Sequence, residues 1–408
     1  MKKNIQKSWN TISLDTLNLY HKVIIKSKKS QTSKNRIYKG TPIVDKLILF
    51  SIISLAALFR FWELKSRFIF SGETNNILYS IQNLLKGDQS PLVGQQASYL
   101  HHLFQTPWYL YSMVPLFLIS KGEPLYFAFT HSLLGVVSVW LMYKIGKNIK
   151  NKKFGYITAF VYAVTLEVIN LDRSVWALSL IPLSTILSVY LLILSIKNKR
   201  ILFYCLLGIS MGFGLSLHYQ FIIPATFIYL WIFIKKRDKF IYSLLPFLIS
   251  LTPLFIFDIR HNFFNLVGLQ LTSKILIEGN SAYSSKHFLY FTYPIVIISV
   301  SYIIKSINSK ILVILLIIYL IIQGQLFIKY NAQPNYAERS ALTNKILDKY
   351  NNGLKVFFKK GDSYEYKFLL LSRAKQRSLD ISKIVIYDPW NPPDKYDIAI
   401  ENEEIKLH

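Results

Sequence analysis

The sequence predicts an all-α polytopic membrane protein with about nine transmembrane helices, a cytoplasmic N-terminus, a large first outer loop and a small C-terminal α/β extracytoplasmic domain. Of the 408 residues, 52% are hydrophobic and 17% are charged, against roughly 25% charged in soluble domains. The mean hydropathy is +0.31, and the apolar residues form long runs instead of amphipathic stripes. Basic residues gather in short loops between these runs. These observations exclude an ordinary cytosolic enzyme and a disordered protein.

The predicted spans begin near Lys46, and several are shorter than the roughly 20 residues of a full crossing because helix ends recruit flanking residues. Their ranges are 46–62, 125–143, 154–170, 175–196, 201–217, 220–235, 241–257, 287–304 and 311–328. The apolar segment from Trp108 to Ile119 is too short to cross. We therefore expect residues 107–121 to form a helix in the outer interface, where tryptophan and tyrosine are common.

The basic residues predict the orientation of the chain. Of the 48 lysines and arginines, 25 lie in residues 1–46 and in the loops 144–153, 197–200, 235–239 and 301–310. All of these segments fall on one side, which the positive-inside rule assigns to the cytoplasm. The net charge of +26 therefore reflects a lipid bilayer as partner and not nucleic acid. Because residues 1–45 lack the apolar core of a signal peptide, we expect the first span to act as a signal anchor, in a plasma membrane.

Composition divides the chain into three predicted parts. They are a basic cytoplasmic segment (1–45), a membrane module (46–328) whose first outer loop covers 63–124, and a small soluble extracytoplasmic α/β domain (329–408). Residues 330–408 hold 11 of the 22 acidic residues together with 13 basic ones. The apolar periodicity of this tail predicts a helix at 337–352, a strand at 354–359, a helix at 364–374, and strands at 383–387 and 397–400.

The acidic side chains before the tail indicate that the outer side is the functional one. Eight of these 11 acids map to outer loops or to the outer ends of spans, namely Glu63, Glu73, Asp88, Glu123, Glu167, Asp172, Asp258 and Glu278. Ionisable groups near lipid are costly, so they are candidates for function. A carboxylate can accept a proton from an attacking hydroxyl, and arginine or histidine can hold a phosphate oxygen that gains charge. The single cysteine, Cys205, excludes a disulfide framework and a thiolate metal cluster.

Three of these positions bring acids together with arginines. Glu73 lies in the first outer loop, Asp172-Arg173 ends the third span, and Asp258-Ile259-Arg260-His261-Asn262 ends the seventh. If the helices converge, the three segments share one site. Structural interpretations stay open beside this one, because Glu73 also fits a solvated loop charge and Asp172-Arg173 fits an interfacial ion pair or a helix-end cap.

Other polar residues also have two interpretations. The pair His101-His102 could belong to a metal site, but no third ligand follows at a recognisable spacing, which favours an exposed polar pair. His218-Tyr219, at a span end, fits either substrate binding or an interfacial polar belt. The aromatic residues between 99 and 111 could line the groove of a lipid tail or stack on a sugar, or form the same kind of belt.

The order of these motifs resembles that of the membrane-embedded glycosyltransferases of the protein mannosyltransferase and aminoarabinose transferase type, a family 39-like group with the GT-C fold. The resemblance covers about residues 60 to 330 and, more loosely, the tail. It is carried by Gly72-Glu73, Lys86-Gly87 with Pro91-Leu92-Val93-Gly94, Thr106-Pro107-Trp108-Tyr109-Leu110-Tyr111, Leu171-Asp172-Arg173-Ser174-Val175-Trp176 with Pro182, Leu217-His218-Tyr219 with Pro224, and Phe257-Asp258-Ile259-Arg260-His261-Asn262-Phe263. The specificity lies in their order and spacing together.

The resemblance implies an inverting transferase that takes a sugar from a polyprenyl-phosphate donor at the outer membrane face. It assigns Glu73 to orienting or deprotonating the acceptor and Asp172 to the second acid. The donor phosphate would contact Arg173, Arg260 and His261. Further substrate contacts implied in this way are His102, Tyr109, His218, Tyr219 and Asp258. The acceptor, whether protein, lipid or glycan, and the sugar itself are not encoded in any of these motifs.

The first outer loop departs from the family pattern in one respect. Family members often carry two adjacent acids, or an acid and a glutamine, whereas Thr74-Asn75-Asn76 follow Glu73 here. This departure weakens the case for a carboxylate-bound metal and leaves a one-acid mechanism in which a divalent metal is optional and no cofactor is required.

Two other functional classes remain open from the sequence. A transporter or flippase of lipid-linked saccharides would also need many spans, although such proteins usually place binding groups near the bilayer midplane within inverted repeats, which are not evident here. A non-catalytic membrane scaffold of a glycan-assembly complex would bind its partners through residues 330–408. A transferase instead depends on Glu73.

Overall fold

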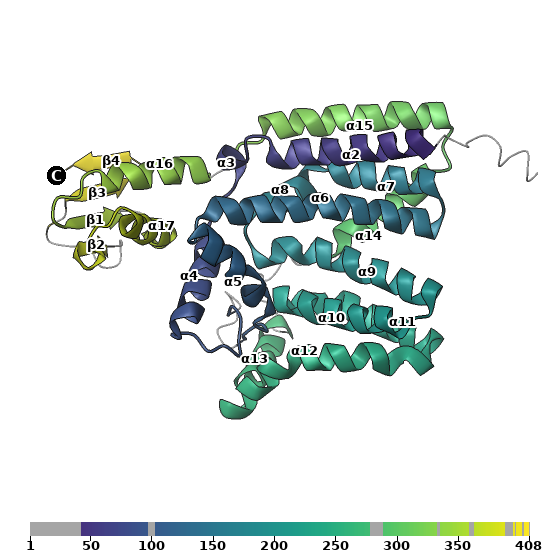
Figure 1. Ribbon diagram of the computed structural model, residues 1–408, viewed down its shortest axis with the longest axis horizontal. Helices are drawn as coiled ribbons and strands as arrows, with labels where there is room; N and C mark the ends of the chain where they lie inside the picture. The colour runs from purple at the N-terminus through teal and green to yellow at the C-terminus, as the bar shows by residue number, and fades with distance from the viewer. Residues whose placement is uncertain are drawn as a thin grey trace, which may run out of the picture. The chain divides into compact units, whose positions relative to one another are not determined.

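The computed structural model describes residues 42–96, 103–277, 289–332, 335–358, 363–387, 395, 397–401 and 404–407. The chain divides into two compact units, residues 1–51 and residues 52–408. In the first unit the described residues form the beginning of helix α2 (Pro42–Phe61). In its described residues, the second unit is mostly helical and contains one small sheet (Figure 1).

Every segment predicted to cross the membrane contains a helix. The helices after α2 in this part of the chain are α3 (Leu64–Arg67), α4 (Gly72–Lys86), α5 (Trp108–Ser120), α6 (Pro124–Ile149), α7 (Lys152–Val164), α8 (Leu166–Arg173), η2 (Ala177–Leu180), α9 (Ile181–Asn198), α10 (Ile201–Leu217), η3 (Tyr219–Phe221), α11 (Ile222–Lys235), η4 (Arg237–Lys239), α12 (Phe240–Arg260), α13 (Phe264–Ile277), α14 (Thr292–Ile304) and α15 (Ser309–Lys329). The helix expected at residues 107–121 is α5. The segment 63–124, predicted to be the first outer loop, also contains α3 and α4.

Apolar length separates these helices into groups. Among the described residues, four helical segments are long and apolar enough to cross a membrane, namely Pro124–Ile149, Ala177–Asn198, Arg237–Arg260 and Ser309–Lys329. The pair α7 and α8 passes the same test together. The segments Trp108–Ser120, Ile201–Leu217, Tyr219–Lys235 and Thr292–Ile304 are shorter apolar helices. The protein thus has several apolar helices of membrane type, and the total of nine spans stays a prediction.

The third predicted span is not one straight helix, because α7 and α8 meet at a bend of 64°. Thr165 between them is extended, with φ −64° and ψ 117°. Its hydroxyl lies 2.9 Å from that of Tyr319, and the amide of Leu166 donates to Gln323 Oε1 at 2.8 Å. Backbone groups freed by a break at membrane depth need such partners. Side chains of α15 therefore stabilise the bend, which turns α8 and the Asp172-Arg173 segment away from the axis of α7.

Close packing of α10 against α12 depends on glycine. A Cβ atom on Gly208 would overlap the carbonyl oxygen of Ser243 in α12, which is backbone and cannot move away by a rotamer change. We expect Gly208→Ala to destabilise the protein by about 1–3 kcal/mol, as overpacking does. Gly324→Ala in α15 is the matched control, because no atom lies within 4 Å of the added Cβ. Thermal unfolding in detergent compares the two variants, and equal melting temperatures would contradict the close approach.

The C-terminal region forms a small α/β structure with its own hydrophobic cluster. Its elements are α16 (Tyr336–Leu347), β1 (Leu354–Phe358), α17 (Ser363–Gln376), η7 (Ile381–Lys383), β2 (Ile384–Tyr387), β3 (Ile398–Glu401) and β4 (Glu404–Leu407). The sheet order is β2-β1-β3-β4, with β1 parallel to both neighbours and β3 antiparallel to β4. Ile346 and Val356 are fully buried in the cluster between helices and sheet. All five elements expected in the tail are present, and β4 is an additional strand.

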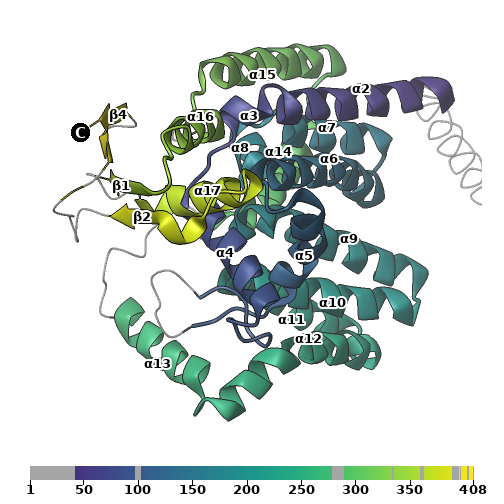
Figure 2. The same ribbon diagram turned by 60° about the vertical axis from the view of Figure 1, so that its left-hand side comes forward.

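The segment 63–124 and the C-terminal region contact each other directly. Helix α17 packs on α4, and α16 packs on α3 (Figure 2). The aromatic rings of Tyr79 on α4 and Phe368 on α17 meet edge to face, with centroids 5.3 Å apart. The loop that carries Glu73 is therefore packed between the membrane module and the tail.

Candidate functional site

Glu73 lies in the first turn of α4, where the positive end of the helix dipole favours a carboxylate. Ser71, the N-cap residue of α4, makes no capping hydrogen bond with its side chain. Instead, the hydroxyl of Thr74 donates to the carbonyl oxygen of Val175 at 3.1 Å. This bond joins the start of α4 to the segment that follows Asp172-Arg173. Glu73 itself is half-buried at this junction.

Asp172 forms a buried ion pair with Arg60, near the end of α2. Its Oδ2 lies 2.7 Å from Nη2 and 2.8 Å from Nε of Arg60, and the two side chains are 6% and 0% exposed. Arg60 also donates to the carbonyl of Ala163 at 3.0 Å. A Cβ on Gly135 of α6 would overlap the Asp172 carboxyl group. The pair differs from the interfacial one expected of Asp172-Arg173, because it is buried and the partner of Asp172 is Arg60. Asp172 thereby joins α2, α6 and α8.

Arg173 is buried, and its hydrogen bonds go to backbone carbonyls at the C-terminal end of α2. Its Nε donates to the carbonyl of Arg60 at 3.2 Å, and its Nη2 donates to that of Trp62. Carbonyls at a helix C-terminus lack intrahelical partners, and an arginine there satisfies them and complements the dipole. Within the described residues the Nη1 group of Arg173 has no hydrogen-bond partner. Arg173 therefore caps α2 and keeps one donor for a further acceptor.

A second arginine, Arg67, which the sequence did not single out, lies over the same phenylalanine ring as Arg173. Arg67 and Arg173 contact Phe327 of α15, with guanidinium carbons 4.7 Å and 4.9 Å from the ring centroid. Arg67 donates to the carbonyl of Phe327 at 2.6 Å and to that of Tyr330 at 3.2 Å. Arg67 thus caps α15 as Arg173 caps α2, and the two guanidinium groups share the Phe327 ring.

The two later motifs, around residues 218 and 258, meet at Phe104. Tyr219 donates its hydroxyl proton to the carbonyl of Phe104. The amide of Phe104 donates at 2.6 Å to Oδ1 of Asn265, whose own side chain donates at 2.8 Å to Oδ1 of Asp258. The ring of Phe104 also lies 5.5 Å from that of Phe257. Segments more than 100 residues apart therefore converge, with Phe104 as their common contact.

The remaining candidates occupy different positions. Arg260 and His261 are exposed at the end of α12, and the His261 ring stacks on Phe257 with centroids 4.1 Å apart. Nδ1 of His218 accepts a hydrogen bond from the amide of Gln220 at 3.1 Å and so caps η3. His102 lies outside the described residues.

A buried histidine, which no motif in the sequence indicated, links Tyr109 to the Asp172-Arg173 segment. Nε2 of His131 lies 3.4 Å from the Tyr109 hydroxyl, and its Nδ1 lies 3.0 Å from Oγ of Ser179. Ser179 in turn donates to the carbonyl of Ser174 at 2.9 Å. His131 and Tyr109 are 0% and 1% exposed. A lone histidine in an apolar span is the one signal that could have identified it.

The described residues contain no group of three or more His, Cys, Asp and Glu side chains that could hold a metal ion.

Comparisons with known proteins place these features in context. Residues 105–259 match the family model of dolichyl-phosphate-mannose-protein mannosyltransferase. None of the curated proteins matches the chain by sequence. Among solved structures, the oligosaccharyltransferase of Archaeoglobus fulgidus in complex with Zn and sulfate has a TM-score of 0.50 at 12% identity, over 84% of this chain and 62% of that one. Its apo form has a TM-score of 0.50 at 11% identity, over 86% and 65%.

The chain spans less than two thirds of the length of these solved structures, and the low identity restricts the likeness to the fold. The matched segment 105–259 contains α5 to α12 almost entire, with Tyr109, Asp172, Arg173, Tyr219 and Asp258. The chain therefore has the GT-C fold of membrane glycosyltransferases, and its residues 105–259 match the dolichyl-phosphate-mannose-protein mannosyltransferase family.

Proposed function

We propose that the protein transfers a sugar from a polyprenyl-phosphate carrier to an acceptor at the outer face of the plasma membrane, with inversion at the anomeric carbon. The observation that carries the proposal is the position of Glu73 in the first turn of α4, next to Thr74, whose hydroxyl bonds to Val175 just after the Asp172-Arg173 segment. The matched family model, whose description names a lipid-phosphate sugar, supports the donor class.

In the proposed reaction Glu73 is the general base. Its carboxylate accepts the proton of an acceptor hydroxyl while the hydroxyl oxygen forms a bond to the anomeric carbon. The bond from that carbon to the phosphate oxygen breaks on the opposite face, and the electron pair leaves with the polyprenyl phosphate. One displacement inverts the configuration. Binding at the lipid boundary suits this donor because its isoprenoid tail stays in the bilayer while its phosphate reaches the surface.

We assign the leaving phosphate to cations at the outer ends of helices. Arg260 and His261 are exposed and available to phosphate oxygens, which arginine binds in a bidentate manner. Arg173 contributes at most its free Nη1 donor, since its other nitrogens hold the end of α2. The burial and pairing of Asp172 lead us to assign it a structural role, so Glu73 is the only acid in the proposed reaction.

The experiment that tests the function offers donors directly. Full-length protein purified into nanodiscs is incubated with a panel of radiolabelled polyprenyl-phosphate sugars and with cell-envelope extract as the source of acceptor. We expect label from one donor to move to a non-lipid or lipid-linked product with release of polyprenyl phosphate. Transport of labelled donor across sealed vesicles without any product would overturn the proposal in favour of a flippase.

The proposed orientation can be tested separately. We propose that residues 1–45 and the basic loops are cytoplasmic, that 46–328 form the membrane module, and that 329–408 lie outside. In a Cys205→Ala background, Lys147→Cys should resist a membrane-impermeant maleimide in whole cells, whereas Lys121→Cys should react. The two exposures follow from the positive-inside rule. The opposite labelling pattern would reverse the orientation and move the site to the cytoplasmic face.

A further inference from the structure

The segment just before Glu73 is held by the C-terminal region. Ile69 pairs with Asn335 in an antiparallel β-bridge, and the amide of Tyr336 donates to the carbonyl of Phe68 at 2.9 Å. The ring of Tyr336 lies 5.6 Å from that of Phe68 and 5.8 Å from that of Phe70. Main-chain bonds and ring packing thus fix residues 68–70 onto the start of α16.

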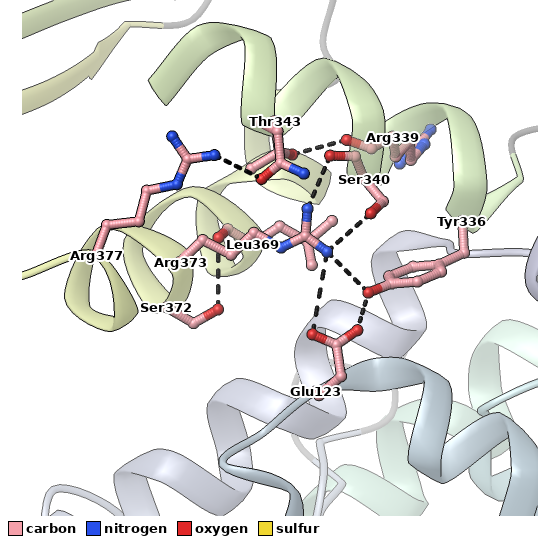
Figure 3. A network of polar contacts seen from close by, with 10 residues as sticks. Glu123, Tyr336, Arg339, Ser340, Thr343, Leu369, Ser372, Arg373 and Arg377 are labelled. Atoms are coloured by element: carbon pink, nitrogen blue, oxygen red, sulfur yellow. Dashed lines mark hydrogen bonds and ion pairs between the residues drawn. The ribbon is translucent and has the colours of Figure 1, made fainter. Parts of the chain in front are cut away.

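The hydroxyl of Tyr336 anchors this contact to the membrane module (Figure 3). Tyr336 is 1% exposed and donates its proton to Oε1 of Glu123, the residue before α6. Nη2 of Arg373 on α17 donates to the same hydroxyl at 2.9 Å and lies 4.0 Å from Oε2 of Glu123. Burial raises the pKa of Glu123, and the Arg373 guanidinium opposes that rise.

Arg373 is itself held in place within the tail. Its guanidinium donates to the carbonyl of Ser340 at 2.7 Å and to the hydroxyl of the same residue at 2.8 Å. Tyr336, Glu123 and Arg373 therefore form a clamp, which we call the Tyr336 clamp. A charged hydrogen-bonded group of this kind has one favoured geometry, because a partly satisfied buried network is costly.

The clamp matters for Glu73 because α4 lacks a side-chain cap at its own start. Two contacts with other segments of the chain hold the first turn of α4. One is the bond from Thr74 to Val175, and the other is the packing of Phe70 on Tyr336. Further along α4, the ring of Tyr79 packs on that of Phe368 in α17. The tail therefore holds the chain on both sides of the proposed base.

We propose that Tyr336 is a positioning residue for Glu73, so that the C-terminal region takes part in sugar transfer by holding the general base in place. The inference rests on the proposed function of Glu73 and deepens it. A shift of about 1 Å in a reacting group can cost about 100-fold in rate. A change in the clamp should thus lower kcat without a comparable change in the KM for the donor.

The test uses Tyr336→Phe, which removes the bridging hydroxyl and keeps the ring against Phe68 and Phe70. We expect kcat to fall on the order of tenfold to 100-fold, the KM for the donor to change by less than about threefold, and amide exchange in residues 68–76 to become faster. Glu123→Gln, which can still accept from Tyr336, should retain most of the activity, whereas Glu123→Ala should resemble Tyr336→Phe.

Arg377→Met is the matched control. Arg377 also lies on α17 (Figure 3), but its contacts are with Asp348 at 2.7 Å and Asn344 at 3.1 Å, both inside the tail. It should leave kcat and the exchange of residues 68–76 unchanged. If Tyr336→Phe keeps wild-type kcat and exchange while Glu73→Gln is inactive, the clamp is not a positioning device and the proposed function stands. If no donor yields product, the proposed function fails, and the exchange measurement still decides whether the clamp orders the start of α4.

Discussion

Glu73→Gln is expected to abolish measurable sugar transfer, with kcat lowered by roughly 10²–10⁴-fold, the range that a general base contributes. Glutamine preserves the length and shape of the side chain but cannot accept the proton of the acceptor hydroxyl. Because Glu73 is half-buried at the start of a helix, the substitution should alter the melting temperature only slightly. Initial rates with the donor identified by the radiolabelled panel measure the effect.

Glu63→Gln is the control for this change. Glu63 is the residue before α3, and its side chain is 56% exposed and pairs with Arg67 at 3.1 Å. It should keep wild-type kcat, and Glu73→Asp should recover part of the activity because a carboxylate remains. Full activity of Glu73→Gln would remove the proposed base and with it the one-acid mechanism.

Breaking the ion pair between Arg60 and Asp172 should produce the largest loss of stability. Both side chains are almost fully buried, and Arg60→Met would leave the Asp172 carboxylate without its counter-charge. Removal of one partner from a buried pair costs about 3–5 kcal/mol. Thermal unfolding in detergent should show this as a marked fall in melting temperature, and much of the protein should fail to insert stably.

The double variant Arg60→Met with Asp172→Leu separates a structural pair from a catalytic acid. Replacement of both charges by apolar groups of similar size is often neutral for stability, so the double variant should fold and retain transfer activity. A double variant that folds normally yet has no activity would return Asp172 to the reaction as a second acid. The pair of Arg377 and Asp348, whose side chains are 37% and 63% exposed, provides the comparison, since surface pairs contribute at most about 1 kcal/mol.

Local sequence patterns predicted much of the secondary structure. The apolar runs predicted α2, α5 to α12, α14 and α15, because the length and composition of a run are properties of a continuous segment. The helices α3, α4 and α13 lie in segments that the sequence predicted to be loops. The tail elements followed for the same reason, apart from β4. The bend at Thr165 could not be predicted, because neither proline nor glycine marks it and its partners Tyr319 and Gln323 come from a helix 150 residues further along.

The candidate site divides in the same way. Motif order identified Asp172, Tyr219 and Asp258 as residues at helix ends, and the structure brings Tyr219 and Asp258 together at Phe104. It also engages Asp172 with Arg60, across 112 positions in the chain, which no local pattern indicates. His131 and Tyr336 were missed because a single histidine in an apolar run and a single tyrosine in a tail have many ordinary explanations.

The sequence by itself determined which segments form apolar helices, which loops are basic and where acidic residues follow helix ends. These features depend on neighbours along the chain and on the preference of each residue for lipid or water. The tertiary structure alone decided which of the charged side chains pair with one another, which remain exposed at the surface, and that the tail clamps the loop of Glu73. Those outcomes depend on partners distant in sequence, because a buried charge or hydroxyl must be satisfied by whatever group the fold places within hydrogen-bonding distance.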